Sequence, residues 1–413
     1  MTVIRRFSDL DWRFLLLILP AFFLLVYICV SSIPISTFPT AFAPVASFFF
    51  NWTTADSSSP PPVYELDGRK IAVCLVGGAR RFELTGPSIV ESVLKVYPNA
   101  DLFLHSPLDK NSFKFSLLKI APRIAAIRIF KPRNINETEA EVRVLTSAGS
   151  PNGIQGLLQY FNLVEGCLTL IQEHQKQNQF IYDWIIRTRV DGYWNAPLHP
   201  SNFIPGHYLI PPGSNYGGLN DRLGIGDYNS TVVALSRLSL IPKLDSIGYR
   251  NLNSETSFRA QLTSHGIYYK ARRLPFCIVS DRRYVFPPGQ YGVPVAALSS
   301  PGPLSGAKCR PCTPICEGKC VRETMSVLDK GWSWTDWENG SLDLCNAQDE
   351  WEEGWEKIFD RVAGKKRAAV RKRIRDLKMK ECVADFNEMR WRTFRWDSPP
   401  ADEICKLGLE KSN

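Results

Sequence analysis

The chain of 413 residues has few of the motifs on which several large enzyme classes depend. It has only five histidines, and no two of them are spaced as a convincing pair of metal ligands. It contains no Gly-x-Ser-x-Gly motif, no P-loop and no Gly-x-Gly-x-x-Gly motif. Internal repeats and long low-complexity tracts are also absent. The sequence therefore gives no support to a serine hydrolase, a P-loop enzyme or a dinucleotide-binding fold.

Long apolar runs are rare too, and the one present lies near the N-terminus. Phe14–Val30 carries no charge and spans roughly 25 Å as a helix, which covers a thin bilayer. Arg5, Arg6 and Arg13 precede it, and no basic residue follows before Arg69. The positive-inside rule then places residues 1–13 in the cytosol and the rest in the lumen. This predicts a single-pass type II signal-anchor in the Golgi membrane, because a cleaved signal peptide has a shorter core and the plasma membrane is thicker.

Two further patterns suit a luminal, glycosylated body. Asn-x-Ser/Thr sequons and ten of the eleven cysteines follow the anchor, and an oxidising compartment permits disulfides. The sequons begin at Asn51, Asn136, Asn229 and Asn339. We expect disulfides rather than a zinc site in the cluster Cys309, Cys312, Cys316 and Cys320, with Cys345, Cys382 and Cys405 as further partners. Cys167 lies among apolar residues and is expected to be a buried thiol.

Positive charge is confined to one segment of the chain. The formal net charge is +9, and residues 361–380 hold ten Lys/Arg and one acid, Asp376, so the remainder sums to zero. A luminal position argues against a nucleic-acid partner for this segment. A solvated helix face and a site for an acidic polysaccharide are the two interpretations left open.

Composition divides the chain into regions. Ser and Pro enrichment predicts an extended stem, and a Pro/Gly/Ser/Ala-rich stretch predicts a linker. The expected regions are a cytosolic tail at 1–13, an anchor at 14–30, a stem at 31–66, a main domain at 67–285, a linker at 286–308 and a Cys-rich, basic helical subdomain at 309–413. The last region also holds Trp332, Trp334, Trp337, Trp351 and Trp355, which either pack a small core or stack on sugar rings.

Apolar periodicity in the main domain predicts an α/β fold with a largely parallel sheet, because strand and helix patterns alternate. Strands are expected at 70–76, 100–105, 125–130, the first half of 180–194, 208–210 and 267–272, helices at 88–96, 113–120, 153–175, 231–240 and 256–263, and a Gly/Pro/Asn loop at 211–226.

The first candidate site follows the first strand. Gly77 and Gly78 would let a phosphate approach the backbone, and Arg80 and Arg81 would supply forked donors to its oxygens. An ordinary turn with solvated arginines explains this motif equally simply. The second candidate is sharper, because a buried strand ends in charge. Alternation places Arg187, Arg189 and Asp191 on one face, where they would hold a diphosphate directly or through a metal, or else form a structural ion pair.

Two further candidates lie downstream. Asn220 and Asp221 belong to a Gly-rich loop, where Asp221 is expected to face a sugar hydroxyl. Glu255 opens a predicted helix and is a candidate general base for an attacking hydroxyl. The plain alternatives are a surface loop for the first and a first-turn acid favoured by the helix dipole for the second.

Three segments carry a resemblance to a known family: IAVCLVGGARRFE, YDWIIRTRVDGYW and LNDRLGIGDYNSTVVAL. They resemble the sugar-nucleotide-dependent glycosyltransferases of the GT-A type, in particular a plant group of type II membrane proteins and microbial relatives in polysaccharide synthesis. The resemblance covers about residues 70–285. It implies a GT-A-like mixed, mostly parallel sheet flanked by helices, a nucleotide-sugar donor at the first strand's end, and an Asp-x-Asp motif for Mn²⁺ or Mg²⁺. Asp191 matches the last Asp of that motif, but Arg189 stands at its first position, so metal-independent action is equally open.

The resemblance implies transfer of a sugar to a glycan or acidic polysaccharide hydroxyl in the Golgi lumen. A base would deprotonate the acceptor while positive charge stabilises the departing nucleoside diphosphate. The alternative is a non-catalytic luminal protein, in which a degenerate transferase fold binds glycans or acts as a scaffold.

Overall fold

A computed structural model describes residue 66 and residues 68–148, 152–285, 293–326 and 342–410. The expected cytosolic tail and anchor, and the stem up to residue 65, lie outside these residues. Within the described ranges, no helix is both long and apolar enough to cross a membrane. The described residues all belong to one compact unit.

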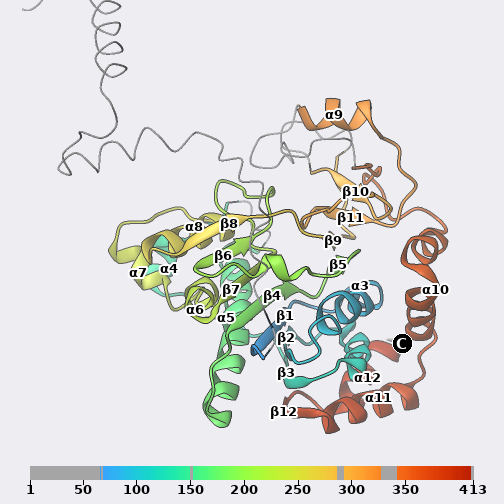
Figure 1. The fold of residues 1–413 in the computed structure, drawn as a ribbon, viewed down its shortest axis with the longest axis horizontal. Helices are drawn as coiled ribbons and strands as arrows, with labels where there is room; N and C mark the ends of the chain where they lie inside the picture. Colours follow the sequence, from blue (N-terminus) through green and yellow to red (C-terminus); the bar gives the residue numbers. More distant parts are fainter. Residues whose placement is uncertain (1–65, 67, 149–151, 286–292, 327–341, 411–413) are drawn as a thin grey trace, which may run out of the picture. The chain divides into compact units, whose positions relative to one another are not determined.

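A mixed sheet of eight strands forms the centre of this unit (Figure 1). Its order is β12 (Thr393–Asp397), β3 (Ile124–Phe130), β2 (Asp101–Pro107), β1 (Ile71–Val76), β4 (Trp184–Arg189), β7 (Leu223–Asp227), β6 (His207–Ile210) and β8 (Tyr268–Ala271). Neighbouring strands are parallel except at β7, which runs antiparallel to both β4 and β6. The prediction of a mostly parallel α/β sheet flanked by helices is thus confirmed. The strand β7 was not predicted, because its residues were assigned to a loop.

Helices cover both faces of the sheet. The helices of the described residues are α3 (Phe82–Ile89), α4 (Glu139–Val144), α5 (Gly153–Asn178), α6 (Tyr228–Leu235), α7 (Ile241–Ser246), α8 (Ser254–Ser264), α9 (Lys319–Ser326), α10 (Trp355–Arg375), α11 (Met379–Trp391) and α12 (Ala401–Leu409), with shorter turns at Val90–Leu94, Ser112–Ile120 and Pro200–Asn202. Of these, α9 packs with residues of a second, smaller sheet. All six residues of β1 are buried. Val73 and Leu75 pack with Phe82 of α3 on one face, whereas Ala72 and Val76 pack with Val164 of α5 on the other. This two-sided burial explains the continuous apolar run of β1.

A second sheet of four strands lies beside the end of β4. Its order is β10 (Val295–Ala297), β11 (Lys308–Arg310), β9 (Phe276–Val279) and β5 (Gly192–Trp194). β5 follows β4 after only two residues, so the chain passes directly from one sheet to the other. The expected linker at 286–308 therefore contributes β10 and the first residue of β11, since its small residues fit the buried strands at Val295–Ala297.

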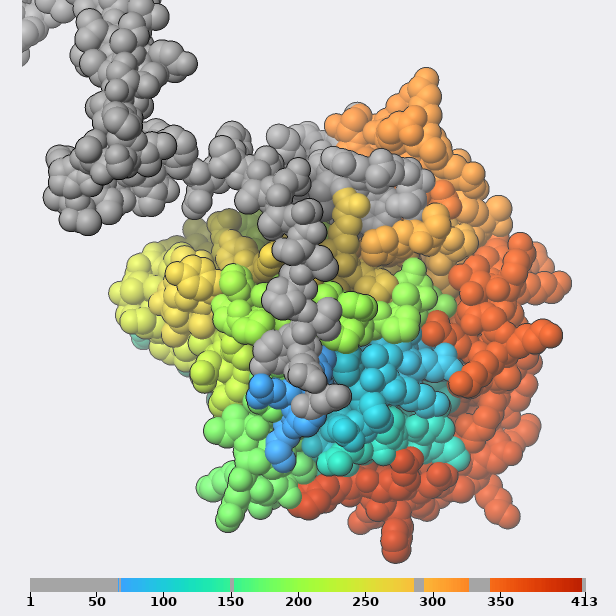
Figure 2. Space-filling view, viewed as in Figure 1, coloured from blue at the N-terminus to red at the C-terminus, as the bar shows by residue number. Residues whose placement is uncertain are grey.

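The C-terminal residues pack onto the main sheet, which differs from the separate subdomain that composition suggested. β12 is hydrogen-bonded to β3 as the outermost strand. Residues of α10 and α11 lie alongside those of the first helices and strands (Figure 2), and Ile374 and Phe386 belong to the same apolar cluster as Leu75. The apolar positions of these helices face the sheet, so the segment completes the main fold.

Ten cysteines of the described residues form five disulfides, as the luminal topology predicted. The pairs are Cys74–Cys167, Cys277–Cys309, Cys312–Cys345, Cys316–Cys320 and Cys382–Cys405. The prediction of a free buried thiol at Cys167 was wrong. The side chain faces β1 from α5, which brings it to Cys74.

Candidate functional site

The carboxyl ends of β1 and β4 lie side by side and form the base of the candidate site. The two strands are parallel, with Val76 opposite Arg189, so the segments that follow them leave the same edge of the sheet. Gly77 has φ +126°, and a Cβ there would lie 3.0 Å from Cγ2 of Val190. Glycine is required by both the backbone conformation and this close approach. The first two predicted motifs are thus brought together, as their positions after parallel strands indicated.

Arg189 and Asp191 form a two-pronged ion pair at this edge. Nε and Nη2 of Arg189 donate to the two carboxylate oxygens of Asp191 at 2.8 and 2.6 Å. Burial acts to raise the pKa of Asp191, but the charge and hydrogen bonds of Arg189, with the charges of Lys308 and Arg80, lower it to about 2. The carboxylate is therefore ionised and already bound by an arginine.

This arrangement does not fit a divalent cation held by the protein. Among the described residues, no group of three or more His, Cys, Asp or Glu side chains is placed to hold a metal ion. Asp191 would have to release Arg189 to act as a ligand, and the neighbouring charges are positive. Arg189, which stands where the resemblance would place a first Asp, therefore forms an ion pair with Asp191.

Lys308 is a member of the site that the sequence did not reveal. It begins β11 and pairs with Ile278 of β9, whose other neighbour is Gly192, the residue after Asp191. Arg222 reaches the same place, because its Nη1 donates to the carbonyl of Gly306 at 2.6 Å. Within the described ranges, the Lys308 ammonium has no hydrogen-bond or ion-pair partner.

The environment of Lys308 disfavours its own charge. Burial, followed by the charges of Arg222 and Arg189, lowers the pKa of Lys308 well below its usual value, and the charge of Asp191 offsets this only in part. Arg282 adds a further positive charge nearby. A partly buried lysine among three arginines is unfavourable by itself, and an anion would relieve the repulsion. The site therefore has the electrostatics of an anion-binding site.

Arg187 and Asp221 act inside the protein rather than at its surface. Nη1 of Arg187 donates to the backbone carbonyl of Asp221, and Nη2 donates to the hydroxyl of Tyr160. The carboxylate of Asp221 accepts a hydrogen bond from Oγ of Ser254 at 2.7 Å and lies 3.6 Å from Nη1 of Arg237. Burial acts to raise the pKa of Asp221, but Arg237 and Arg187 lower it overall. Asp221 was expected to face a sugar hydroxyl, whereas these partners hold it against the start of α8.

Glu255 is next to this network and has the opposite protonation behaviour. It follows Ser254 in the first turn of α8, which Asn253 caps through the backbone N–H of Thr256. Burial and the negative charge of Asp221 raise the pKa of Glu255 to about 8, although its own backbone N–H and two arginines act in the other direction. Two neighbouring carboxyl groups whose pKa values shift in opposite directions are suited to general acid–base chemistry.

The Gly-rich loop presses directly on this helix start. The backbone N–H of Leu219 donates to the carbonyl of Glu255 at 3.1 Å, and a Cβ on Gly218 would lie 2.0 Å from that same carbonyl group. Asn220 shapes the loop, since its amide donates to the carbonyl of Pro212 and its Oδ1 accepts from the N–H of Arg222. The third and fourth predicted motifs therefore meet, but Asn220 serves the loop's conformation.

The two arginines after β1 have different surroundings. Nε of Arg81 donates to Asp281 at 2.7 Å, and its guanidinium lies 4.2 Å above the ring of Trp351. Trp351 in turn packs edge-on against Trp355, which favours the small-core interpretation of these tryptophans. Trp332, Trp334 and Trp337 lie outside the described residues. Arg80 is exposed, and its charge acts on Asp191.

A cavity of about 360 Å³ adjoins these strand ends. It is lined by Pro107 at the end of β2, Phe130 at the end of β3, and Tyr160 of α5. Pro107 also faces Gly78, and Tyr160 is the partner of Arg187. Two lining residues of the cavity therefore contact residues next to the candidate site, although none of the site's own cations lines it.

The basic run at 361–380 is largely neutralised by acids, some of which lie outside that window. Arg371 and Lys372 contact Asp360, Arg373 contacts Asp385, and Arg375 contacts Asp376. Arg371 is also buried, with 4% of its surface exposed. Most cations of the segment are nevertheless exposed, as a solvated helix face predicts, while their acidic partners leave less free positive charge for an acidic polysaccharide.

Comparison with known proteins places the chain in a family. Residues 66–411 match the family model described as Domain of unknown function (DUF7796). The chain belongs to this family. The match spans both sheets of the DUF7796 chain and the C-terminal helices, so the compact unit corresponds to the family's domain.

Among solved structures, the DUF7796 chain is similar to the crystal structure of mouse xyloside xylosyltransferase 1 in its apo form. The identity is 15% and the TM-score 0.31, over 49% of this chain and 85% of the mouse chain. No curated protein matches the sequence.

Proposed function

We propose that the protein is a glycosyltransferase that moves a sugar from a nucleotide-sugar donor to a glycan or polysaccharide hydroxyl in the Golgi lumen. The observation that carries this proposal is the group of cations at the carboxyl end of the parallel strands, together with a carboxyl group with a raised pKa, since the charge of Arg222 acts on both Lys308 and Glu255. Lys308, Arg189 and Arg80 supply the positive charge, and Glu255 is the titratable group. Ligands of open α/β sheets bind at this edge.

In the proposed reaction, the cations hold the diphosphate of the donor. Glu255, once deprotonated, takes the proton of the acceptor hydroxyl as the new glycosidic C–O bond forms. The bond between the sugar's anomeric carbon and the diphosphate oxygen breaks, and the electron pair leaves with the nucleoside diphosphate. Lys308 and Arg189 stabilise the charge that develops on it. The cavity beside Tyr160 would receive the nucleoside.

We further propose that this transfer does not depend on a metal ion. The support is the set of groups around the diphosphate position. Asp191 is bound by Arg189, and Lys308, whose charge acts on Asp191, has no partner among the described residues. Mn²⁺ or Mg²⁺ bound with the donor would remain the alternative, with the metal held mainly by the diphosphate.

The covalent chemistry of the described residues supports a luminal compartment for the proposed reaction. The disulfides suit an oxidising compartment, and the sequon residues Asn136 and Asn229 are both exposed and open to glycan attachment. The anchor itself rests on the sequence of Phe14–Val30.

A specific observation also favours the second candidate, a non-catalytic luminal glycan-binding or scaffolding protein. The pair between Arg189 and Asp191 closes the position where a donor's diphosphate would meet a carboxylate-bound metal. A degenerate transferase fold would keep the sheet but lose its catalytic activity through such an ion pair.

The test is donor turnover by the full chain purified in detergent. A panel of UDP- and GDP-sugars would be incubated with Mn²⁺ or with EDTA, and nucleoside diphosphate release and thermal shift would be measured. Arg189→Gln and Asp191→Asn should abolish release. The matched control is Asp376→Asn, because Arg375 and Asp376 form the same two-pronged pair on the surface, at 2.9 and 3.0 Å.

Release in EDTA that depends on Arg189 and Asp191 would support metal-independent transfer. Release only with Mn²⁺ would refute the metal-independent form. If no donor causes a thermal shift or releases nucleoside diphosphate, the proposed enzyme activity is refuted. The glycan-binding function is then the remaining candidate.

A further inference from the structure

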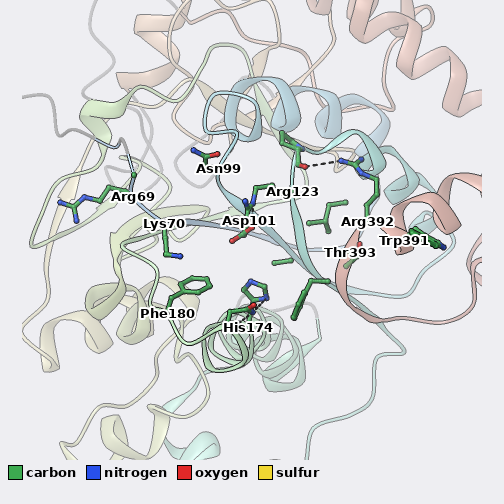
Figure 3. A pocket seen from close by; sticks show the side chains of 16 residues that line it. Arg69, Lys70, Asn99, Asp101, Arg123, His174, Phe180, Trp391, Arg392 and Thr393 are labelled. Atoms are coloured by element: carbon green, nitrogen blue, oxygen red, sulfur yellow. Dashed lines mark hydrogen bonds and ion pairs between the residues drawn. The ribbon is translucent and has the colours of Figure 1, made fainter.

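A second pocket lies at the opposite edge of the main sheet from the candidate site. It has a volume of about 680 Å³ and lies where β1, β2, β3 and β12 begin (Figure 3). These four strands are parallel, so their starting ends share one edge. The last turns of α5 and Phe180 form its other side. Nothing in the proposed transfer reaction uses this pocket.

Aromatic rings with unusual exposure stand at its rim. Trp391 has 92% of its surface exposed and Phe394 has 61%. Both line the pocket, and Phe180 lines it from the far side with the Lys70 ammonium 4.0 Å above its ring. An exposed tryptophan is costly in water unless a partner covers it, and flat rings of this kind pack on the apolar faces of sugars.

Polar side chains in fixed positions form the floor. The Asp101 carboxylate, 8% exposed, accepts hydrogen bonds from the Tyr182 hydroxyl and from Nε of Arg123, each at 2.8 Å. His174 is also buried, and burial lowers its pKa, so its neutral ring both donates and accepts. Figure 3 shows Asp101 and His174 facing the same cavity. Oriented groups of this type recognise hydroxyl groups.

The charge of the lining is mostly positive. Four cations, Arg69, Lys70, Arg123 and Arg392, line the pocket with one carboxylate, Asp101. Arg392 donates to the backbone carbonyl of Ala121 at 2.8 Å and, like Lys70, has no carboxylate partner among the described residues. Two uncompensated cations therefore remain for a ligand's negative groups.

We propose that this pocket binds an acidic saccharide, a chain whose sugar rings carry carboxylates. The rings of Trp391 and Phe394 pack on the faces of the sugar rings. Asp101 and His174 form hydrogen bonds with hydroxyl groups. Lys70 and Arg392 bind the carboxylates. A lipid surface is less compatible, because the aromatic residues border a concave pocket rather than a flat face. The inference does not depend on the proposed transfer reaction, because binding here needs no donor.

The experiment is isothermal titration of the full chain in detergent with oligogalacturonides, and with cello-oligosaccharides of the same length as neutral probes. We expect the acidic probe to bind with a salt-dependent affinity. Trp391→Ala should weaken it by about tenfold or more. Lys70→Met should weaken it and reduce the salt dependence. Matched controls are Tyr268→Ala, an aromatic residue that is 74% exposed on β8, and Lys243→Met, an exposed lysine on α7.

Equal binding of the acidic and neutral probes would overturn the charge argument. No binding of either probe, or binding that Trp391→Ala leaves unchanged, would overturn the site. Anionic phosphatidylserine vesicles are the competing probe. Vesicle binding lost in Trp391→Ala, without oligosaccharide binding, would assign the surface to a membrane and refute the proposal. Because Trp391 is almost fully exposed, its replacement should leave the melting temperature unchanged.

Discussion

The raised pKa of Glu255 makes a prediction about stability that is independent of any activity. The pKa of this carboxyl is about 8 in the folded chain, because burial and Asp221 oppose its charge, and it returns to its ordinary value near 4.5 on unfolding. The contribution of Glu255 to stability is thus fully present below pH 4.5. It is lost as the pH rises to 8, since the unfolded chain ionises first. Glu255→Gln removes this titration.

The size of the effect follows from the shift. A displacement from 4.5 to about 8 corresponds to about 5 kcal/mol when fully expressed. Glu255 keeps part of its surface exposed and is coupled to Asp221, so solvent screens part of this, and we expect about 2 kcal/mol. Glu255→Gln should therefore gain about 2 kcal/mol relative to the natural chain between pH 5 and pH 8.5.

Chemical denaturation at both pH values measures this difference directly. Glu139→Gln is the matched control, because Glu139 is also a first-turn glutamate, on α4, and has 91% of its side chain exposed. A stability difference between Glu255→Gln and the natural chain that stays constant with pH would refute the reasoning. A stability difference that becomes smaller as the pH rises would also refute the reasoning.

The same titration governs the proposed transfer. If Glu255 is the base, only its deprotonated form is active, so kcat should rise about tenfold per pH unit up to about pH 8. A flat profile over this range in a chain that turns over donor would show that another group takes the proton.

Three other substitutions test particular contacts. Lys308→Met should weaken the binding of inorganic pyrophosphate about tenfold, because the substitution removes an ammonium group that has no partner among the described residues. Isothermal titration calorimetry measures the affinity, and unchanged binding would remove Lys308 from the site. Gly218→Ala should lower the free energy of unfolding by about 2–3 kcal/mol, because the added Cβ would meet the backbone of Glu255. Denaturant unfolding measures this loss, and an unchanged free energy of unfolding would contradict the contact. Replacing Cys74 and Cys167 together by alanine should cost about 3–4 kcal/mol, since the bridge closes 93 residues; a free-thiol assay that finds both thiols in the natural chain would disprove the pairing.

The sequence predicted the parallel half of the main sheet well, because its strands are buried on both faces and read as apolar runs. β7 was missed for a physical reason. Its Gly224 and Gly226 resemble a loop, but a Cβ on either would lie within 3 Å of Tyr208, whose ring covers them from β6. β12 was missed because it is short and none of its five residues is buried at the sheet's edge, and its only two apolar residues are Phe394 and Trp396.

For the site, the local sequence pattern identified the residues at the strand ends. It could not identify residues that distant segments of the chain bring to those ends. Arg189 and Asp191 could be identified because they are charged residues at the end of a buried strand. Lys308 gave no such signal, because only the pairing of β11 with β9 brings it near Asp191. The sequence also did not show that Asp221 is buried in an ion pair, because this depends on its contacts with Arg237 and with the start of α8.

The position of β12 has a consequence for how the chain is made. It lies far along the chain from β3, yet it is the only strand that covers the outer edge of β3 among the described residues. During synthesis the apolar strand Ile124–Phe130 therefore has an unpaired edge until Thr393–Asp397 has been made. A stop codon before Thr393 would leave that edge permanently open. We expect such products to be held by chaperones and degraded before export, so their loss would appear as missing protein instead of reduced activity.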